Sequence, residues 1–162
     1  MLFRSVHDRH LKILGKEHRD TLATYHEGAL ILYHLCDYKK ALLWNTTAFD
    51  GRVKLLGGNH PDTLSSAHAR ALIFDRMENY MMAERWNGDA YVGRVKVLGK
   101  EHPDTICTSK SRALIFDHLG KYNDARSWYE RTFDVCRKVF GVMHPDTRDC
   151  ALKRDLMQDK LH

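Results

Sequence analysis

Histidines and cysteines are the residues of this chain best suited to chemistry, and their spacing limits what that chemistry is. Four of the 11 histidines recur once every 42 residues: His18, His60, His102 and His144. Side chains separated by such a long regular interval do not converge on one ion. Two closer pairs lie one and two helical turns apart, namely His7 with His10 and His26 with His34. Neither pair has the further cysteine or carboxylate that would complete a zinc site, so we predict no metal and no cofactor.

No catalytic constellation is recognisable in the sequence. It has no Gly-rich phosphate loop, no G-x-S-x-G elbow and no H-E-x-x-H motif, so we predict that the chain is not an enzyme. Its four cysteines show neither C-x-x-C spacing nor a disulfide-framework pattern: Cys36, Cys107, Cys136 and Cys150. We therefore expect reduced thiols and a cytoplasmic protein. No apolar run of about 18 residues predicts a membrane span.

Each recurring histidine lies in an octapeptide, Leu-Gly-x-x-His-Pro-Asp-Thr, which begins at positions 14, 56, 98 and 140. The first copy has Arg19 in place of proline, and the last begins with Phe140. Glycine is suited to ending a helix in the left-handed conformation, and proline to starting the next one. The aspartate then places negative charge near the positive end of the helix dipole. We interpret the octapeptide as a break between helices and its histidine as a cap or turn residue.

Two apolar patterns with helical spacing lie between successive octapeptides. The first predicts helices over residues 21–35, 63–77 and 105–119, and the second over 39–56, 81–98 and 123–140. The second pattern carries an alanine and a tryptophan at matching places: Ala41, Ala83, Ala125, Trp44, Trp86 and Trp128. Small alanines let paired helices approach closely, and we expect the tryptophans to pack between neighbours rather than stack on bases or a cofactor. The sequence therefore predicts an all-α fold of repeated antiparallel helix pairs.

This arrangement resembles the tetratricopeptide repeat, in the lengthened 42-residue form of kinesin light chains. The resemblance rests on the octapeptide, on the tyrosine at each turn between paired helices and on the alanine three residues later, and it covers nearly the whole chain. It implies a right-handed α-solenoid whose first helices line a concave groove that binds a protein or peptide. The glycine usual at the turn is present only as Gly120, with Cys36 and Glu78 at the equivalent positions.

We assign residues 1–162 to a single helical-repeat array. Residues 1–15 match only the second helix of a unit, three units follow at 16–57, 58–99 and 100–141, and residues 142–162 are predicted as a C-terminal capping helix. In that cap, running from Arg148 to His162, we expect Leu152, Leu156 and Leu161 to face inward. The N-terminal end has no such cap, and an exposed apolar face there would favour self-association.

The net charge of +5 and an isoelectric point near 9.0 suggest nucleic acid or an acidic peptide as partners. Much of the positive charge falls late in the second helices: Arg52, Lys54, Arg94, Lys96, Arg137 and Lys138. Cations there oppose the negative end of the helix dipole, which is an ordinary structural role. Nucleic-acid binding is therefore the less favoured interpretation.

The predicted binding surface is the side of the first helices that faces away from their Ala/Phe stripe. A leucine recurs at each level, flanked by basic and aromatic side chains: His26, Leu30, Tyr33, His34, His68, Leu72, Arg76, Lys110, Leu114 and His118. A peptide would place apolar side chains along the leucines and carboxylates against Arg76 and Lys110, although Asp75 and Asp117 would partly cancel the cations. Because several of these groups are histidines, we expect an acidic partner to bind more tightly as the pH falls from about 7.5 toward 6.

The predicted function is thus a non-enzymatic scaffold for protein–protein interaction that binds a peptide or protein segment in the concave groove. Two alternatives stay open. One is a structural module that forms homo-oligomers through its uncapped N-terminal end, and the other is nucleic-acid binding through a basic surface.

Overall fold

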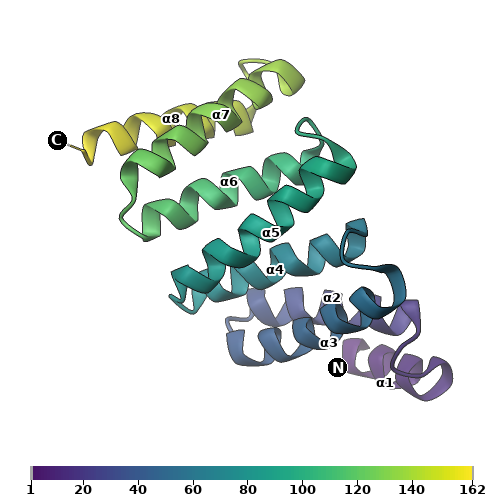
Figure 1. Ribbon diagram of the computed structural model, residues 1–162. Coiled ribbons are helices and arrows are strands. Elements are labelled where there is room, and N and C mark those ends of the chain that lie inside the picture. The colour runs from purple at the N-terminus through teal and green to yellow at the C-terminus, as the bar shows by residue number, and fades with distance from the viewer. Residues whose placement is uncertain (1, 162) are drawn as a thin grey trace.

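The computed structural model describes the backbone of residues 2–161 and the side chains of residues 8–161. Within these residues the chain forms eight α-helices and no strand (Figure 1). In chain order they are α1 (Leu2–Leu14), α2 (Arg19–His34), α3 (Tyr38–Leu56), α4 (Pro61–Arg76), α5 (Tyr80–Leu98), α6 (Pro103–His118), α7 (Tyr122–Phe140) and α8 (Pro145–Asp159). Each helix packs against the next, so the prediction of an all-α solenoid is confirmed.

The histidine of each octapeptide is the N-cap of the helix that follows. Its Nδ1 accepts a hydrogen bond from the backbone N–H two residues later, at 3.1 Å in α4 and α6 and at 3.2 Å in α2 and α8. On the other side of the break, Gly57 follows α3 with a φ of 87°, which only glycine adopts without strain. The Thr63 hydroxyl donates to the Gly57 carbonyl at 2.9 Å. The cap interpretation is confirmed, because the ring pairs a backbone donor that a helix start otherwise leaves free.

Small residues bring the paired helices α2–α3, α4–α5 and α6–α7 into close contact. The alanines that recur on both helices are fully buried: Ala29, Ala41, Ala71, Ala83, Ala113 and Ala125. Glycine extends this principle on α5, where a Cβ added to Gly93 would lie only 2.4 Å from Cδ2 of Leu64 on α4. The close approach of each pair therefore depends on side chains that leave room for the partner helix.

Tryptophan packs between successive second helices, as predicted. The rings of Phe49 and Trp86 join α3 to α5 edge to face with centroids 5.1 Å apart, and Tyr91 and Trp128 join α5 to α7 at 4.9 Å. The guanidinium of Arg70 on α4 lies against the first pair, 4.6 Å from the Phe49 ring centroid and 4.3 Å from that of Trp86. These rings are therefore occupied by packing and cation–π contacts.

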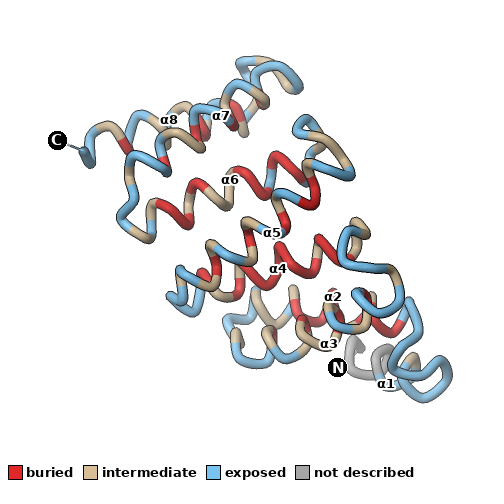
Figure 2. The backbone as a smooth tube through the Cα atoms, viewed as in Figure 1, coloured by how far each residue is buried: buried red, intermediate tan, exposed pale blue. Residues whose placement is uncertain are grey.

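The first helices form the inner row of the stack. The backbone of α4 lies close to those of α2 and α6, whereas α3, α5 and α7 are linked to one another through long aromatic side chains. The more closely spaced row lies on the inside of a curved solenoid. In Figure 2 the buried residues concentrate on α4 and α6, which are covered on both sides by neighbouring helices.

The C-terminal helix shows a different face from the one predicted. The three leucines predicted to face inward, two on α8 and one just beyond its end, are exposed, with 62%, 47% and 36% of their surface accessible: Leu152, Leu156 and Leu161. The buried positions are Thr147, Cys150 and Met157. The prediction that these leucines face inward is wrong, because α8 begins at Pro145 and keeps the register of α6. Its buried face therefore repeats the buried face of α6, whereas Leu152 is exposed and Leu156, the register equivalent of Leu114, lines an open pocket together with Leu114.

Candidate protein-binding groove

The inner row of helices carries a pocket between α6 and α8. Its volume is about 310 Å³, and its lining includes Cys107, Lys110, Leu114, Asp146, Asp149 and Lys153. Leu114 has counterparts in Leu30 on α2 and Leu72 on α4, and all three leucines are half-buried. The predicted leucine row therefore lies along the inner helices with part of each side chain accessible to a partner.

Two of the predicted groove histidines lie inside the protein instead. His26 and His68 are only 9% and 8% exposed. The Nδ1 atom of His26 lies 3.4 Å from the Ser66 hydroxyl oxygen on α4, and Nε2 of His68 lies 3.9 Å from the Cys107 sulfur on α6. The expectation that these rings face an open groove is wrong, because neighbouring first helices pack together at these positions.

Burial also changes the acid–base behaviour of the two rings. Loss of hydration lowers the pKa of His26 to about 4, and the nearby positive charge of Arg52 acts in the same direction. Burial lowers the pKa of His68 to about 3, with a further contribution from Arg94. Both rings are therefore neutral between pH 7.5 and 6. They do not supply the pH-dependent attraction for an acidic partner that we expected from the sequence.

Lys110 occupies the equivalent position on α6 and forms an ion-pair cluster with α8. Its Nζ lies 2.5 Å from Oδ1 of Asp146 and 3.5 Å from Oδ2 of Asp149. Burial opposes the charged ammonium, but the hydrogen bond to Asp146 and the charges of both aspartates outweigh it and raise the pKa of Lys110. Its charge is thus already neutralised within the protein, which corrects the expectation that Lys110 meets a partner's carboxylate.

A second set of contacts joins the last turns of successive first helices. The Arg76 guanidinium Nε donates to the Tyr33 hydroxyl oxygen at 3.1 Å, and its carbon lies 5.7 Å from the centre of that ring. One level further along, Nδ1 of His118 lies 2.7 Å from Oδ1 of the buried Asp75. At the third level Lys160 donates to Asp117 at 2.5 Å. In every case a basic group on one helix contacts an acceptor 43 residues earlier.

One of the predicted groove cations, Arg76, is not neutralised by these contacts. Among the described residues, the exposed Arg76 has a hydrogen bond to Tyr33 and no carboxylate partner, and the exposed His34 packs edge to face on the Tyr33 ring at 5.3 Å. By contrast, Lys110 and His118 have carboxylate partners. The structure thus brings Tyr33, His34 and Arg76 together at the ends of α2 and α4, which we call the Arg76 corner.

The acidic wall of the pocket is not among the predicted binding residues, because residues 142–162 are predicted only as a capping helix. Asp146 and Asp149 lie 42 residues after Asp104 and Cys107, so the repeat register places them beside α6. Extending the register one helix further would have identified them. The contacts between a basic residue and an acceptor 43 residues earlier could also have been predicted, because such pairs recur along the sequence at that separation.

The basic residues of the second helices are largely engaged. Arg52 and Arg94 are buried, and each donates through Nη1 to a backbone carbonyl and a hydroxyl of the following first helix. Lys54 lies 3.9 Å from Glu17, and Lys138 contacts Glu101. The late positive charge of these helices therefore serves packing and ion pairs between neighbouring helices.

No group of three or more metal-ligating side chains occurs among the described residues. His10 lies 2.9 Å from the Thr24 hydroxyl through its Nδ1, while the side chain of His7 lies outside the described residues. None of the helices traced between residues 2 and 161 combines the length and apolar character that a membrane crossing requires.

The helix pairs, their caps and their inner row define a tetratricopeptide-type solenoid. The family model of the tetratricopeptide repeat matches residues 21–62, 63–104 and 112–146, so the chain belongs to the tetratricopeptide repeat family. Repeats of this family generally mediate protein–protein interaction. No curated protein matches the chain.

Solved structures with similar folds come from kinesin-light-chain proteins. Two crystal structures of the nearly identical TPR-like repeats of a putative kinesin light chain from Podosopora anserina superpose with TM-scores of 0.80 and 0.78. Each is 21% identical, with 99% of this chain covering 80% and 81% of those chains. BtubC (BKLC) from P. vanneervenii gives a TM-score of 0.80 at 13% identity, with 87% of this chain covering 56% of that chain. The likeness at these identities establishes the kinesin-light-chain type of fold, as the sequence predicted.

Proposed function

We propose that the chain is a non-enzymatic scaffold that binds an extended or helical protein segment along the inner faces of α2, α4, α6 and α8. The observation that carries the proposal is the pocket between α6 and α8, which continues a row of half-buried leucines. Apolar side chains of a partner would enter beside Leu114 and Leu72. A concave face lined by such residues gives an elongated partner more contact area than a flat surface does.

The charges of the groove refine the chemistry of the proposed partner. Lys110 and His118 already face aspartates, so a strongly acidic partner would gain little from them. The Arg76 corner retains an exposed guanidinium whose only bonded neighbour among the described residues is a neutral hydroxyl. We therefore propose a mainly apolar segment with one carboxylate that pairs with Arg76. Two parallel hydrogen bonds between guanidinium and carboxylate would fix its direction in the groove.

The test uses a display library of random peptides screened against the whole chain. Selected peptides should contain apolar residues and an acidic residue, and Arg76→Glu should weaken their binding about tenfold or more, as loss of one charged hydrogen-bonded contact does. Leu114→Ala should weaken the same peptides. Arg126→Glu is the matched control, because it reverses an exposed charge on α7, outside the inner row. Selected peptides that bind Arg76→Glu and Leu114→Ala as tightly as the unchanged chain would exclude this groove.

Self-association is the second candidate, and exposed apolar side chains at the two ends of the stack favour it. Ile31 on α2 is 43% exposed, whereas Ile73 at the same position of α4 is 1% exposed. At the other end of the stack, Leu152 on α8 is 62% exposed. At the N-terminal end, where we expected an exposed apolar face, Leu11 is exposed, and the side chains of Leu2 and Phe3 lie outside the described residues.

Sedimentation velocity over a range of concentrations separates the two candidates. Self-association predicts a sedimentation coefficient that rises with concentration and becomes constant in Ile31→Glu and Leu152→Glu. Val92→Glu, which changes a similarly exposed side chain on α5, should leave it unaffected. Constant sedimentation of the unchanged chain would remove this candidate. Nucleic-acid binding has less support, because most of the basic residues late in the second helices are buried or ion-paired.

A further inference from the structure

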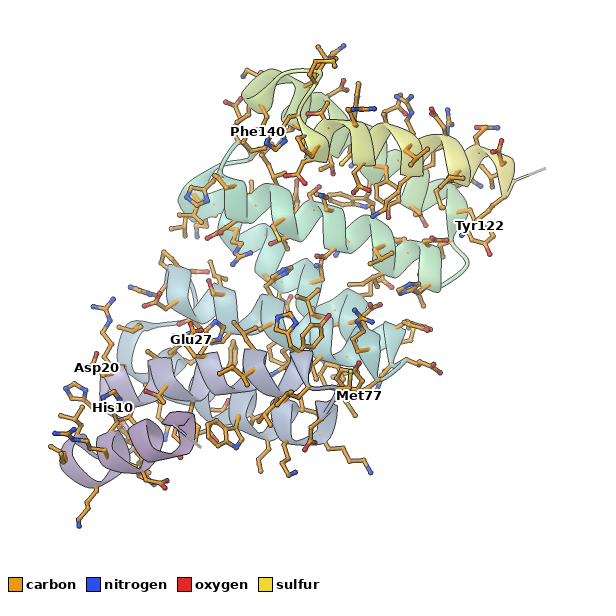
Figure 3. The ribbon with its side chains drawn as sticks, turned by 180° about the vertical axis from the view of Figure 1, so that it is seen from behind. His10, Asp20, Glu27, Met77, Tyr122 and Phe140 are labelled. Carbon is orange, nitrogen blue, oxygen red and sulfur yellow. The ribbon has the colours of Figure 1, made fainter. Side chains whose placement is uncertain are left out.

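Two cysteines lie together where the stack meets its last helix. Cys136 on α7 and Cys150 on α8 are both fully buried, and with Ile106 they form one cluster. Phe133, Val135 and Phe140, the last of which ends α7 in Figure 3, pack against this cluster. The two thiols are close enough to hydrogen-bond to each other. Their environment is thus apolar except for each other.

The repeat register shows that these cysteines replace a different pair of interacting residues. Two registers earlier, Nη1 of Arg52 on α3 donates to the Ser66 hydroxyl on α4 at 2.7 Å. One register earlier, Nη1 of Arg94 on α5 donates to the Thr108 hydroxyl on α6 at 2.6 Å. Cys136 stands 42 residues after Arg94, and Cys150 stands 42 residues after Thr108. Both members of the pair have therefore changed to cysteine at one contact.

We propose that Cys136 and Cys150 form a reversible disulfide that covalently fastens α8 to α7. The geometry carries this inference, because both thiols lie in one buried cluster on adjacent helices, and residues 136 and 150 would close a short loop. At the two preceding contacts the arginine and hydroxyl side chains offer only a hydrogen bond. The third contact is the one at which the chain can form a covalent bond.

The chemistry balances with hydrogen peroxide as the two-electron oxidant. The Cys136 thiolate attacks one peroxide oxygen, and the cysteine sulfenic acid forms as hydroxide leaves. The Cys150 thiolate then attacks the Cys136 sulfur, a second hydroxide leaves, and the protons released by the two thiols convert both hydroxides to water. The hydrogen bond from Cys150 lowers the pKa of Cys136 and raises that of Cys150, which favours Cys136 as the first nucleophile. Opening of the terminal helix α8 gives the peroxide access to the buried thiols.

The cross-link would act on the same part of the molecule as the proposed groove. Ile106 contacts both cysteines and also lines the pocket between α6 and α8. Asp146 and Asp149, which form one wall of that pocket, lie just before Cys150 on the fastened helix. Oxidation would therefore hold this wall in place. This structural effect does not depend on whether a peptide binds in the groove.

The test uses the full chain with the two exposed thiols removed by Cys36→Ser and Cys107→Ser. After peroxide treatment we expect a mass loss of two hydrogens, one cross-linked peptide pair that contains Cys136 and Cys150, and recovery of both thiols with dithiothreitol. The midpoint of thermal unfolding should rise by about 6–12 °C, as a short closed loop in a chain of this size suggests. Hydrogen exchange of the α8 amides should be slower in the oxidised form than in the reduced form.

Cys150→Ser in the same background is the matched control. It should give a Cys136 sulfenic acid that dimedone traps, with no cross-link and no rise in the unfolding midpoint. If the variants do not fold, identification of the cross-linked peptides in the peroxide-treated unchanged chain tests the proposal in the same way. Oxygen addition to separate sulfurs, or two thiols that are still free when the peroxide-treated chain is unfolded and alkylated, would overturn the proposal.

Discussion

The contact between α5 and α6 and the contact between α7 and α8 occupy the same register positions but use different chemistry. In the first, which we call the polar junction, the buried Arg94 donates to the Asp104 carbonyl at 2.9 Å and to the hydroxyls of Thr108 and Ser65 at 2.6 and 3.0 Å. In the second, which we call the thiol junction, Cys136 and Cys150 fill the corresponding space among apolar side chains. The same backbone arrangement thus accommodates either a buried hydrogen-bonded arginine or a pair of buried cysteines.

The difference continues at a second position of the two junctions. On α5 the buried Asn87 donates through Nδ2 to the Thr108 carbonyl at 3.2 Å. Its counterpart on α7 is Tyr129, which is fully buried in a cluster with Phe116 and Met157. Burial raises the pKa of the Tyr129 hydroxyl, so the group is neutral and suits the apolar surroundings. The polar junction depends on many correctly placed partners, whereas the thiol junction depends mainly on apolar packing.

The largest expected effect comes from removing the arginine of the polar junction. Arg94→Ala leaves the Ser65 hydroxyl without its donor, removes the guanidinium bonds to the Thr108 hydroxyl and the Asp104 carbonyl, and opens a cavity. We expect the free energy of unfolding to fall by about 2–4 kcal/mol. Cys136→Ala is the matched change at the thiol junction and should cost about 1 kcal/mol, because it removes one small buried side chain. Urea titrations followed by circular dichroism measure both values.

Equal losses of unfolding free energy in Arg94→Ala and Cys136→Ala would contradict the comparison. The hydrogen bonds of the polar junction would then add nothing measurable to stability. Arg94→Met sharpens the comparison. This variant keeps the apolar stem and loses only the donors, so the part of the loss that methionine does not restore reports on the orphaned acceptors.

Acid should act with an effect of intermediate size at a third contact, between His68 on α4 and Cys107 on α6. Loss of hydration keeps His68 neutral in the folded chain and lowers its pKa to about 3, while an exposed histidine titrates near 6.5. The unfolded chain therefore binds the proton more readily as the pH falls below 6.5. The stability contributed by the neutral ring is complete above that pH and is lost as the pH falls toward the folded value. Between α6 and α8, the hydrogen bond from Lys110 lowers the pKa of Asp146, so this ion pair persists into more acidic solution.

His68→Gln should reduce the loss of stability between pH 7 and pH 5 by about 2 kcal/mol, since the replacement does not titrate. His34→Gln is the control, because that ring is exposed. Denaturant titrations at both pH values provide the measurement. An unchanged pH dependence in His68→Gln would show that the ring is not a source of acid sensitivity.

The repeat period and the octapeptide were sufficient to predict the helices, their caps and the order of the stack. They were sufficient because glycine, histidine and proline act on the backbone next to them. The faces of the first helices were harder to predict. Each inner helix contacts its paired helix and also the neighbouring first helices, so its buried surface is wider than the Ala/Phe stripe. His26 and His68 lie in that second contact, and no periodicity within a single helix identifies it.

The partners of charged residues were predicted least well, because they depend on contacts between helices rather than on spacing within one. Lys110 is a basic residue on the predicted binding face, yet Asp146 and Asp149 on α8 neutralise its charge. Arg76, the last residue of α4, donates to the Tyr33 hydroxyl and has no carboxylate partner among the described residues, so its charge stays available. The difference between these two cations depends on the side chain that the next or previous helix places opposite them.

The smallest expected effect concerns the turns that lead into the second helices. Cys36 and Glu78, at the turns before α3 and α5, both have a φ of 59°, in the left-handed region that disfavours side chains. The turn before α7, which precedes the thiol junction, has Gly120 with a φ of 70°. Glu78→Gly should therefore stabilise the chain by about 0.5–1 kcal/mol, the relief of strain being partly offset by the greater freedom of glycine in the unfolded state. Gly120→Ala is the reciprocal change and should destabilise it by about 1 kcal/mol. Thermal unfolding of the two variants beside the unchanged chain tests both signs. A loss of stability in Glu78→Gly would mean that contacts of the Glu78 side chain outweigh the strain of its backbone.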